Sequence, residues 1–186
     1  MFKGLRFAMS HSILLLATLL LAGCDLSSIG RITVDNIEWQ RTSGSVDRTN
    51  DSIVLRDTNQ KTEMWGDAIS NDLECTFELK FDSGKSDSSV GLEIWRPNEY
   101  SITFRGGLIK VVTAGQVMKT KKVESYIGKC IRVSLKANDK RLFAAIDGVP
   151  LIDEQNMYWK AVLLQPRLNA DIGDTITLYS SSCVTK

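Results

Sequence analysis

Histidine is almost absent from this chain: among 186 residues the only one is His11. The rest of the chain therefore cannot build a Ser-His-Asp or Cys-His nucleophilic site, a histidine general acid or base, or a histidine-containing zinc site. Any catalysis there would use carboxylates, lysine, tyrosine or a bound hard metal ion.

Long apolar runs are also scarce, and the one that stands out, Ile13–Leu21, lies near the N-terminus. It is shorter than the about 20 apolar residues that a membrane-spanning helix needs. Lys3 and Arg6 precede it, and two small residues follow it. A basic region, a short apolar core and small residues are the parts of a secretory signal peptide. We therefore expect this segment to be a signal peptide.

The run Leu21-Ala22-Gly23-Cys24 closes the apolar segment and resembles the lipobox of bacterial lipoproteins. The resemblance implies cleavage before Cys24 and acylation of this residue, which would anchor the protein to a membrane through several acyl chains, such as palmitate. The alternative is an ordinary secretory signal followed by a chance cysteine. We expect a signal peptide at 1–23, a lipidated cysteine and short tether at 24–31, and one β-sandwich domain at 32–186.

Asp25 follows the expected lipidation site and resembles the signal that keeps lipoproteins in the inner membrane of enteric-type bacteria. It favours the inner (cytoplasmic) membrane, with the protein facing the periplasm; the outer membrane is the alternative. The seven residues from Asp25 to Arg31 span at most about 24 Å when extended. The folded domain is therefore expected close to the bilayer surface.

An excess of charge of one sign is missing as well. Two of the 23 basic residues, Lys3 and Arg6, lie in the expected signal peptide, which leaves 21 basic and 22 acidic residues and a formal charge of −1. This balance gives no sign of a nucleic-acid partner.

Beyond Cys24 the chain has three cysteines, Cys75, Cys130 and Cys183. In an oxidising compartment, three cysteines predict one disulfide and one free thiol. Cys75 lies near the start of a clearly predicted strand, and Cys183 lies at the end of the last predicted strand. If these two strands pair antiparallel, the two cysteines lie side by side. Because Cys183 is out of phase with the apolar residues of its own strand, this pairing requires a β-bulge. We predict the disulfide Cys75–Cys183 and a free Cys130.

Alternation of apolar and polar residues is the strongest pattern in the chain, and it is clearest over Leu73–Phe81. A period of two predicts a strand with one face in water. Similar runs recur between turn-forming residues such as Gly106-Gly107. They are Ile32–Trp39, Ser52–Arg56, Ser89–Trp95, Tyr100–Arg105, Leu108–Val112, Cys130–Ala137, Arg141–Asp147, Ala161–Pro166 and Thr175–Ser180. Many short strands with poor helical periodicity predict an all-β antiparallel sandwich.

The late hairpin, Cys130–Ala137 followed by Arg141–Leu151, resembles that of concanavalin-A-like sandwiches, including laminin-G-like modules, where an Asp-Gly turn ends a strand. The order of the strands, with Ser89–Trp95 before the hairpin and Ile176–Leu178 last, is also similar to the bacterial 3-keto-disaccharide hydrolase domain. The resemblance covers about residues 32–183 and implies a concanavalin-A-like β-sandwich (jelly roll).

Two neighbouring strands offer a candidate binding surface. Alternation places Glu93 and Trp95 on one face of Ser89–Trp95, and Thr103 and Arg105 on the outer face of the next strand. We expect these four residues to line the concave sheet, where an indole beside a carboxylate suits a sugar or a protein partner. The alternative is that Trp95 packs beneath the loop that follows it.

The other tryptophans, Trp39, Trp65 and Trp159, are expected to be structural.

The carboxylates of the chain suggest two further hypotheses, a calcium site and a glycosidase site. Calcium would take oxygen ligands from the turn acids, although these are not spaced as a calcium-binding loop; no cofactor is the main expectation. The turn acids are Asp147, Asp153, Glu154, Asp171 and Asp174.

A glycosidase needs two carboxylates about 5 to 10 Å apart, and we would draw only Glu93 and Glu99 across the expected face. The chain has no Glu-x-Asp-x-x-Glu strand of the laminarinase kind. We therefore expect a non-catalytic, membrane-anchored periplasmic binding lipoprotein that recognises an envelope glycan or a protein partner. The alternatives are an immunity protein that neutralises a periplasm-acting toxin and a carbohydrate-active hydrolase that uses carboxylates.

Overall fold

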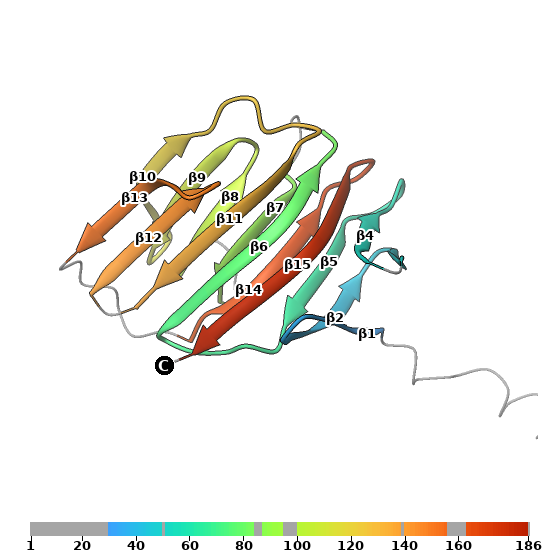
Figure 1. Cartoon of the computed structure of the whole chain (residues 1–186), viewed down its shortest axis with the longest axis horizontal. Coiled ribbons are helices and arrows are strands. Elements are labelled where there is room, and N and C mark those ends of the chain that lie inside the picture. The colour runs from blue at the N-terminus through green and yellow to red at the C-terminus, as the bar shows by residue number, and fades with distance from the viewer. Residues whose placement is uncertain are drawn as a thin grey trace, which may run out of the picture. The chain divides into compact units, whose positions relative to one another are not determined.

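The computed structural model describes residues 30–49, 51–83, 87–94, 100–138, 140–155 and 163–185. Throughout these ranges the regular elements are β-strands, and they form two antiparallel sheets stacked face to face (Figure 1). No helix in this part of the chain is long and apolar enough to cross a membrane. The all-β antiparallel sandwich predicted from the sequence is confirmed.

One sheet has eight strands and the other has seven. In spatial order, the eight-stranded sheet consists of β1 (Arg31–Val34), β2 (Ile37–Ser43), β5 (Thr62–Gly66), β14 (Gln165–Ala170), β7 (Ser89–Glu93), β8 (Tyr100–Arg105), β9 (Leu108–Thr113) and β10 (Gln116–Lys122). The seven-stranded sheet consists of β13 (Val149–Gln155), β12 (Arg141–Ile146), β11 (Cys130–Ala137), β6 (Leu73–Phe81), β15 (Thr175–Thr185), β4 (Ile53–Arg56) and β3 (Val46–Arg48).

The hydrophobic core lies between the sheets and is built by the period-two alternation of their strands. On β6, every second residue from Leu73 to Phe81 points inward and is at most 2% exposed, while the residues between them are exposed or half-buried. Trp39 of β2 is fully buried in the same core, where its Nε1–H donates a hydrogen bond of 3.1 Å to Ser181 Oγ. Its predicted structural role is confirmed.

The predicted disulfide joins the two central strands of the seven-stranded sheet. Cys75 and Cys183 are bonded and directly opposite each other in the register of β6 and β15, with their Cα atoms 4.1 Å apart. The register shifts by one residue between Leu178 and Ser180. This shift is the bulge that the phase mismatch required, because it turns Cys183 from the outer face to the inner one. Cys130 is a free, exposed thiol, also as predicted.

Several predicted strand boundaries are wrong. The expected strand Ile32–Trp39 is a hairpin, since Asp35 has φ of 51° in the turn between β1 and β2. The expected strand Ala161–Pro166 is displaced from β14, where apolar positions alternate with Gln165, Arg167 and Asn169. The alternation was hard to see in the sequence because an apolar run directly precedes β14 and because Pro166 lies within the strand. Strands β3, β5, β10 and β13 were not among the predicted strands.

Candidate functional site

Alternation along β7 and β8 separates the core from the outer face of the eight-stranded sheet, as predicted. Val90, Leu92, Ile102 and Phe104 belong to the hydrophobic core. The residues between them face away from the core, and the structure brings three of the four predicted binding residues, Glu93, Thr103 and Arg105, to one pocket. Trp95, like Glu99 of the expected carboxylate pair, lies outside the described residues.

The pocket has a volume of about 180 Å³ and lies across β14, β7, β8 and β9. Every described residue that lines it carries a charge, a hydroxyl or an amide. They are Lys61, Asp87, Ser89, Glu93, Ser101, Thr103, Arg105, Lys110, Arg167 and Asn169. Pockets for drug-sized ligands have volumes of about 300 to 1,000 Å³, so this one is sized for a single small polar unit.

Arg167 forms the floor of the pocket. Its Nη1 donates to Glu93 Oε2 at 2.6 Å and its Nη2 to Glu63 Oε2 at 2.8 Å. Its guanidinium carbon lies 5.2 Å from the centre of the Trp65 ring, which is itself buried. Two ion pairs and an aromatic contact hold the guanidinium in one orientation, since its planar fork matches carboxylates and ring faces.

A glycine makes room beside this floor. Gly91 of β7 lies between Arg167 of β14 and Thr103 of β8 in the strand register. A Cβ atom at this position would overlap Thr103 Cγ2 and lie 3.1 Å from the backbone oxygen of Ile102. The close approach of β7 and β8 at the pocket therefore depends on glycine.

Burial and charge oppose each other at the floor. Glu93 is only 5% exposed, and this burial raises the pKa of its carboxyl group. The positive charge of Arg167 lowers the same pKa, but by less than burial raises it. Burial disfavours the charge of Arg167, but its two carboxylate partners outweigh this, so the pKa of Arg167 is raised. The guanidinium thus stays charged.

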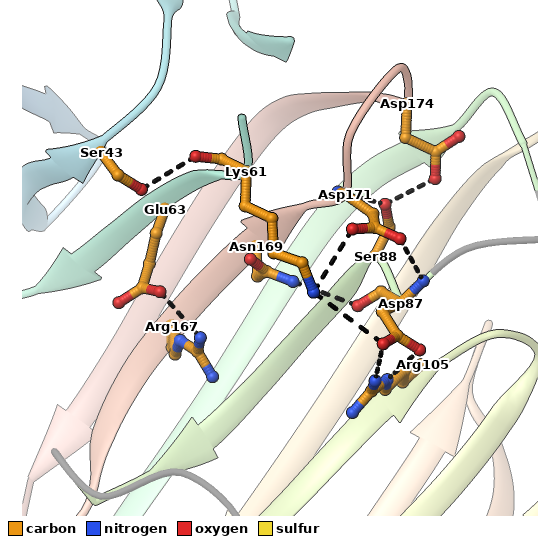
Figure 2. Close-up of polar contacts among 10 residues, drawn as sticks. All are labelled: Ser43, Lys61, Glu63, Asp87, Ser88, Arg105, Arg167, Asn169, Asp171 and Asp174. Carbon is orange, nitrogen blue, oxygen red and sulfur yellow. Dashed lines mark hydrogen bonds and ion pairs between the residues drawn. The ribbon is translucent and has the colours of Figure 1, made fainter. Parts of the chain in front are cut away.

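A second group of charges forms one wall of the pocket (Figure 2). Lys61 Nζ reaches between two aspartates, at 3.3 Å from Asp171 Oδ1 and 3.9 Å from Asp87 Oδ2. Arg105 binds Asp87 with two nitrogens, of which Nε donates to Oδ1 at 3.1 Å. The hydrogen bond from Arg105 lowers the pKa of Asp87. These side chains are partly exposed, so each pair contributes about 0 to 1 kcal/mol to stability.

Buried hydrogen bonds tie this wall to the turn between β14 and β15. Ser88 is 1% exposed; its Oγ accepts the backbone N–H of Asp171 and donates to Asp174 Oδ2. Asn169 Nδ2 donates to the backbone oxygen of Asp87 at 3.1 Å. The wall is therefore held in place by buried and half-buried hydrogen bonds.

Two polar atoms of the pocket have no hydrogen-bond partner in the described structure. They are Arg167 Nε, a donor, and Asn169 Oδ1, an acceptor, and both are buried. Both residues stand on β14, two positions apart, and so point to the same side of the sheet. Leaving such a group unsatisfied costs about 1 to 3 kcal/mol. Buried polar atoms of this kind usually meet water or a ligand.

The five turn acids considered for calcium do not come together. Asp153 binds Arg141, Glu154 binds Lys119, and Asp147 accepts the backbone N–H of Arg132. Asp171 and Asp174 are engaged by Lys61 and Ser88. Within the described ranges no three His, Cys, Asp or Glu residues are grouped to hold a metal ion. The residues therefore do not fit the calcium site that we considered.

Most of the pocket was missed from the sequence. Arg167, Asn169 and Lys110 were not predicted as site residues, although the alternation of Gln165, Arg167 and Asn169 with apolar neighbours is a signal that would have found β14. Lys61 and Asp87 lie in connections just before strands, and their approach depends on the order of strands in the sheet.

Comparison with known proteins shows likeness in fold only. No family model and no curated protein matches the chain. Among solved structures, the carbohydrate-binding module CBM66 from Bacillus subtilis has 14% identity and a TM-score of 0.59, over 79% of this chain and 95% of that one. The exoplasmic/lumenal domain of VIP36 in its Ca²⁺/Man-bound form has 14% identity and a TM-score of 0.60, over 80% and 83%.

The apo Crh5 transglycosylase has 13% identity and a TM-score of 0.64, over 85% of this chain and 81% of that one. A transglycosylase and a carbohydrate-binding module thus share this architecture, and the fold alone does not show which kind of function this chain has. The expected likeness to the 3-keto-disaccharide hydrolase domain stays a prediction, since no family model matches the chain. The domain is a concanavalin-A-like β-sandwich.

Proposed function

We propose that the protein binds a carbohydrate in the polar pocket on the outer face of the eight-stranded sheet. The observation that carries this proposal is the pair of buried, unpartnered atoms in the pocket, Arg167 Nε and Asn169 Oδ1. A sugar hydroxyl both donates and accepts hydrogen bonds, so vicinal hydroxyls would satisfy both atoms at once. The hydroxyls of Ser89, Ser101 and Thr103 line the same pocket.

The neighbours in fold support the proposal, since they include a carbohydrate-binding module and a domain solved with Man bound. The size of the pocket supports it as well. A protein partner, such as the toxin of an immunity protein, would be recognised over a surface of about 800 Å² on each side. A polar pocket of about 180 Å³ suits one sugar unit better.

The proposal includes the place of the protein in the cell. Acylation of Cys24 would anchor it to the inner membrane, and the short segment before Arg31 would hold the sandwich near the bilayer on the periplasmic side. The outer membrane is the alternative. A binding protein anchored in this way would meet the glycans of the cell envelope.

The test is a glycan-array screen of the chain expressed with its own N-terminal segment, followed by calorimetric titration of the glycans that bind. Asn169→Ala removes the unpartnered acceptor and is expected to weaken binding by about tenfold, from the value of one hydrogen bond in a buried site. The matched control is Arg132→Ala on the seven-stranded sheet, where Arg132 forms an exposed pair with Glu78. Equal losses in both variants would count against the pocket.

Hydrolysis is a second candidate, favoured by one observation. Burial raises the pKa of Glu93 within the pocket, and a raised pKa is typical of a carboxylic general acid. The ion pair with Arg167 works against this role because it stabilises the charged carboxylate. Incubation of each bound glycan with the wild-type protein and with Glu93→Gln, followed by product analysis, decides the matter: turnover that Glu93→Gln abolishes would make the protein a hydrolase.

A further inference from the structure

The strands on one side of the pocket, β8, β9 and β10, carry an excess of positive charge. They contain no acidic residue but five basic ones, Arg105, Lys110, Lys119, Lys121 and Lys122. Of these basic residues, Lys119 and Lys121 stand opposite the core residues Val111 and Ile109 in the register and so point away from the pocket face, on which the others lie. Arg105 is paired with Asp87, and Lys119 with Glu154. No ion pair within the described structure involves the other three lysines.

Lys110 is the one of these three that lines the pocket. In the strand register it stands between Thr103 of β8 and Thr120 of β10, and it is partly buried. Because Thr103 faces outward from the sheet, its cross-strand neighbour Lys110 does so too. The ammonium group of Lys110 therefore lies on the side of the pocket opposite β14, the strand that carries Arg167.

The acids around the pocket are already engaged. Glu93 and Glu63 both bind Arg167, Asp87 binds Arg105, and Asp171 binds Lys61. No described carboxylate forms an ion pair with Lys110, and the residues that line the pocket carry four positive charges against two negative ones. An anion that enters the pocket would therefore meet an unpaired ammonium group.

We infer that the carbohydrate is acidic: its carboxylate, sulfate or phosphate group binds Lys110, while its hydroxyls bind Arg167 Nε and Asn169 Oδ1. This inference rests on the proposed function and adds the chemical class of the ligand. Lys122, which is exposed on β10 on the same face of the sheet, extends the positive charge to the sheet edge, where a second acidic unit of a chain would lie.

The test uses pairs of oligosaccharides that differ only in charge: uronate oligomers and their carboxyl-reduced forms, sulfated oligomers and their desulfated forms, and phosphorylated oligomers and their dephosphorylated forms. Each is titrated calorimetrically into the wild-type chain, Lys110→Gln and Lys140→Gln. Lys140 is exposed in the connection between β11 and β12 of the other sheet and gives the same change in charge. Thermal unfolding of all three proteins checks that they are folded.

We expect at least one acidic oligosaccharide to bind about tenfold or more tightly than its neutral form, the scale of one hydrogen bond to a charged group. Lys110→Gln should remove this difference, and Lys140→Gln should leave it as large as in the wild type. Equal affinities for the charged and neutral forms, or a difference that survives in Lys110→Gln, would overturn the inference and leave carbohydrate binding intact. If no acidic or neutral carbohydrate binds the wild-type chain, the proposed function and the inference both fail.

Discussion

Arg167 and Glu93 form a buried ion pair between neighbouring strands on the outer face of the sandwich, with 2.6 Å between Nη1 and Oε2. A pair of opposite charges at this burial contributes little net stability, because desolvation offsets the attraction. Its role is to hold a charged guanidinium at a fixed place in the pocket.

Removing Arg167 should cost more stability than removing Glu93. Arg167→Met leaves the buried carboxylate of Glu93 without its partner and is expected to lower the free energy of unfolding by about 3 kcal/mol, whereas Glu93→Leu leaves Arg167 paired with Glu63 and should cost less. The double variant should lose clearly less than the sum. Urea denaturation of the four proteins in this cycle measures the coupling; additive losses would show that the two charges do not depend on each other.

The glycine at the pocket should tolerate no side chain unless its neighbour shrinks. Gly91→Ala places a methyl group against Thr103 Cγ2, and overpacking of this kind costs about 1 to 3 kcal/mol. Thr103→Ser removes that carbon, so the double variant should recover much of the loss. Thermal denaturation with and without Thr103→Ser tests this, and an unrescued Gly91→Ala would place the conflict elsewhere.

The disulfide should be a major support of the sandwich. It joins residues 108 positions apart in the two central strands of one sheet, and its removal by Cys75→Ala with Cys183→Ala should cost about 2 to 5 kcal/mol. Cys130→Ser changes the free, exposed thiol and should leave stability unchanged. Urea midpoints of the two variants under oxidising conditions provide the comparison. A large loss in Cys130→Ser instead would contradict the pairing.

Acid should weaken the charged wall of the pocket. The pKa of Asp87 is lowered, chiefly by its hydrogen bond from Arg105. A lowered pKa in the folded state means that the stabilisation is complete above the unfolded value of about 3.9 and is lost as the pH falls through the folded value. Since the side chain is 53% exposed, the effect is below about 1 kcal/mol.

Asp87→Asn should therefore be slightly less stable than the wild type at pH 7, and the difference should shrink between about pH 4 and the folded pKa of Asp87. Urea midpoints of both proteins at a series of pH values measure it. If the difference in stability between the two proteins grows as the pH falls, the pKa of Asp87 is not lowered in the folded state.

Membrane attachment should depend on Cys24. Cys24→Ser removes the thiol that the proposed acylation uses, so the protein should move from the membrane fraction to the soluble one or retain an uncleaved N-terminal segment. Mass spectrometry of the wild-type protein should show an acylated N-terminal cysteine. An unmodified wild-type protein in the soluble fraction would restore the alternative of an ordinary secretory signal.

The fold was largely predictable because burial on one face leaves a period-two pattern in the sequence. The bounds of β6, β8 and β11 coincide with the predicted strands, and the phase of Cys183 even required the bulge near Tyr179. Strands without a clear period-two alternation were missed. β10 is exposed at every position, and β5 has buried residues on both faces.

The candidate site was predictable only in part, for a related reason. Glu93, Thr103 and Arg105 lie on two strands adjacent in sequence and in space, so alternation alone brings them together. Arg167 and Asn169 reach the same pocket from a strand more than sixty residues further along, which inserts between β5 and β7. That placement depends on the order of strands in the sheet, about which local patterns say nothing.

The most direct test of the account is a two-dimensional NMR titration of the ¹⁵N-labelled protein with the oligosaccharide that binds most tightly, observing the Arg167 Nε–H and the Asn169 side-chain amide. If the pocket is the binding site, both signals shift at the same saturation, and the Nε–H becomes protected from exchange with water as it gains a partner. Saturation that leaves both signals unchanged while signals of the seven-stranded sheet shift would contradict carbohydrate binding in this pocket.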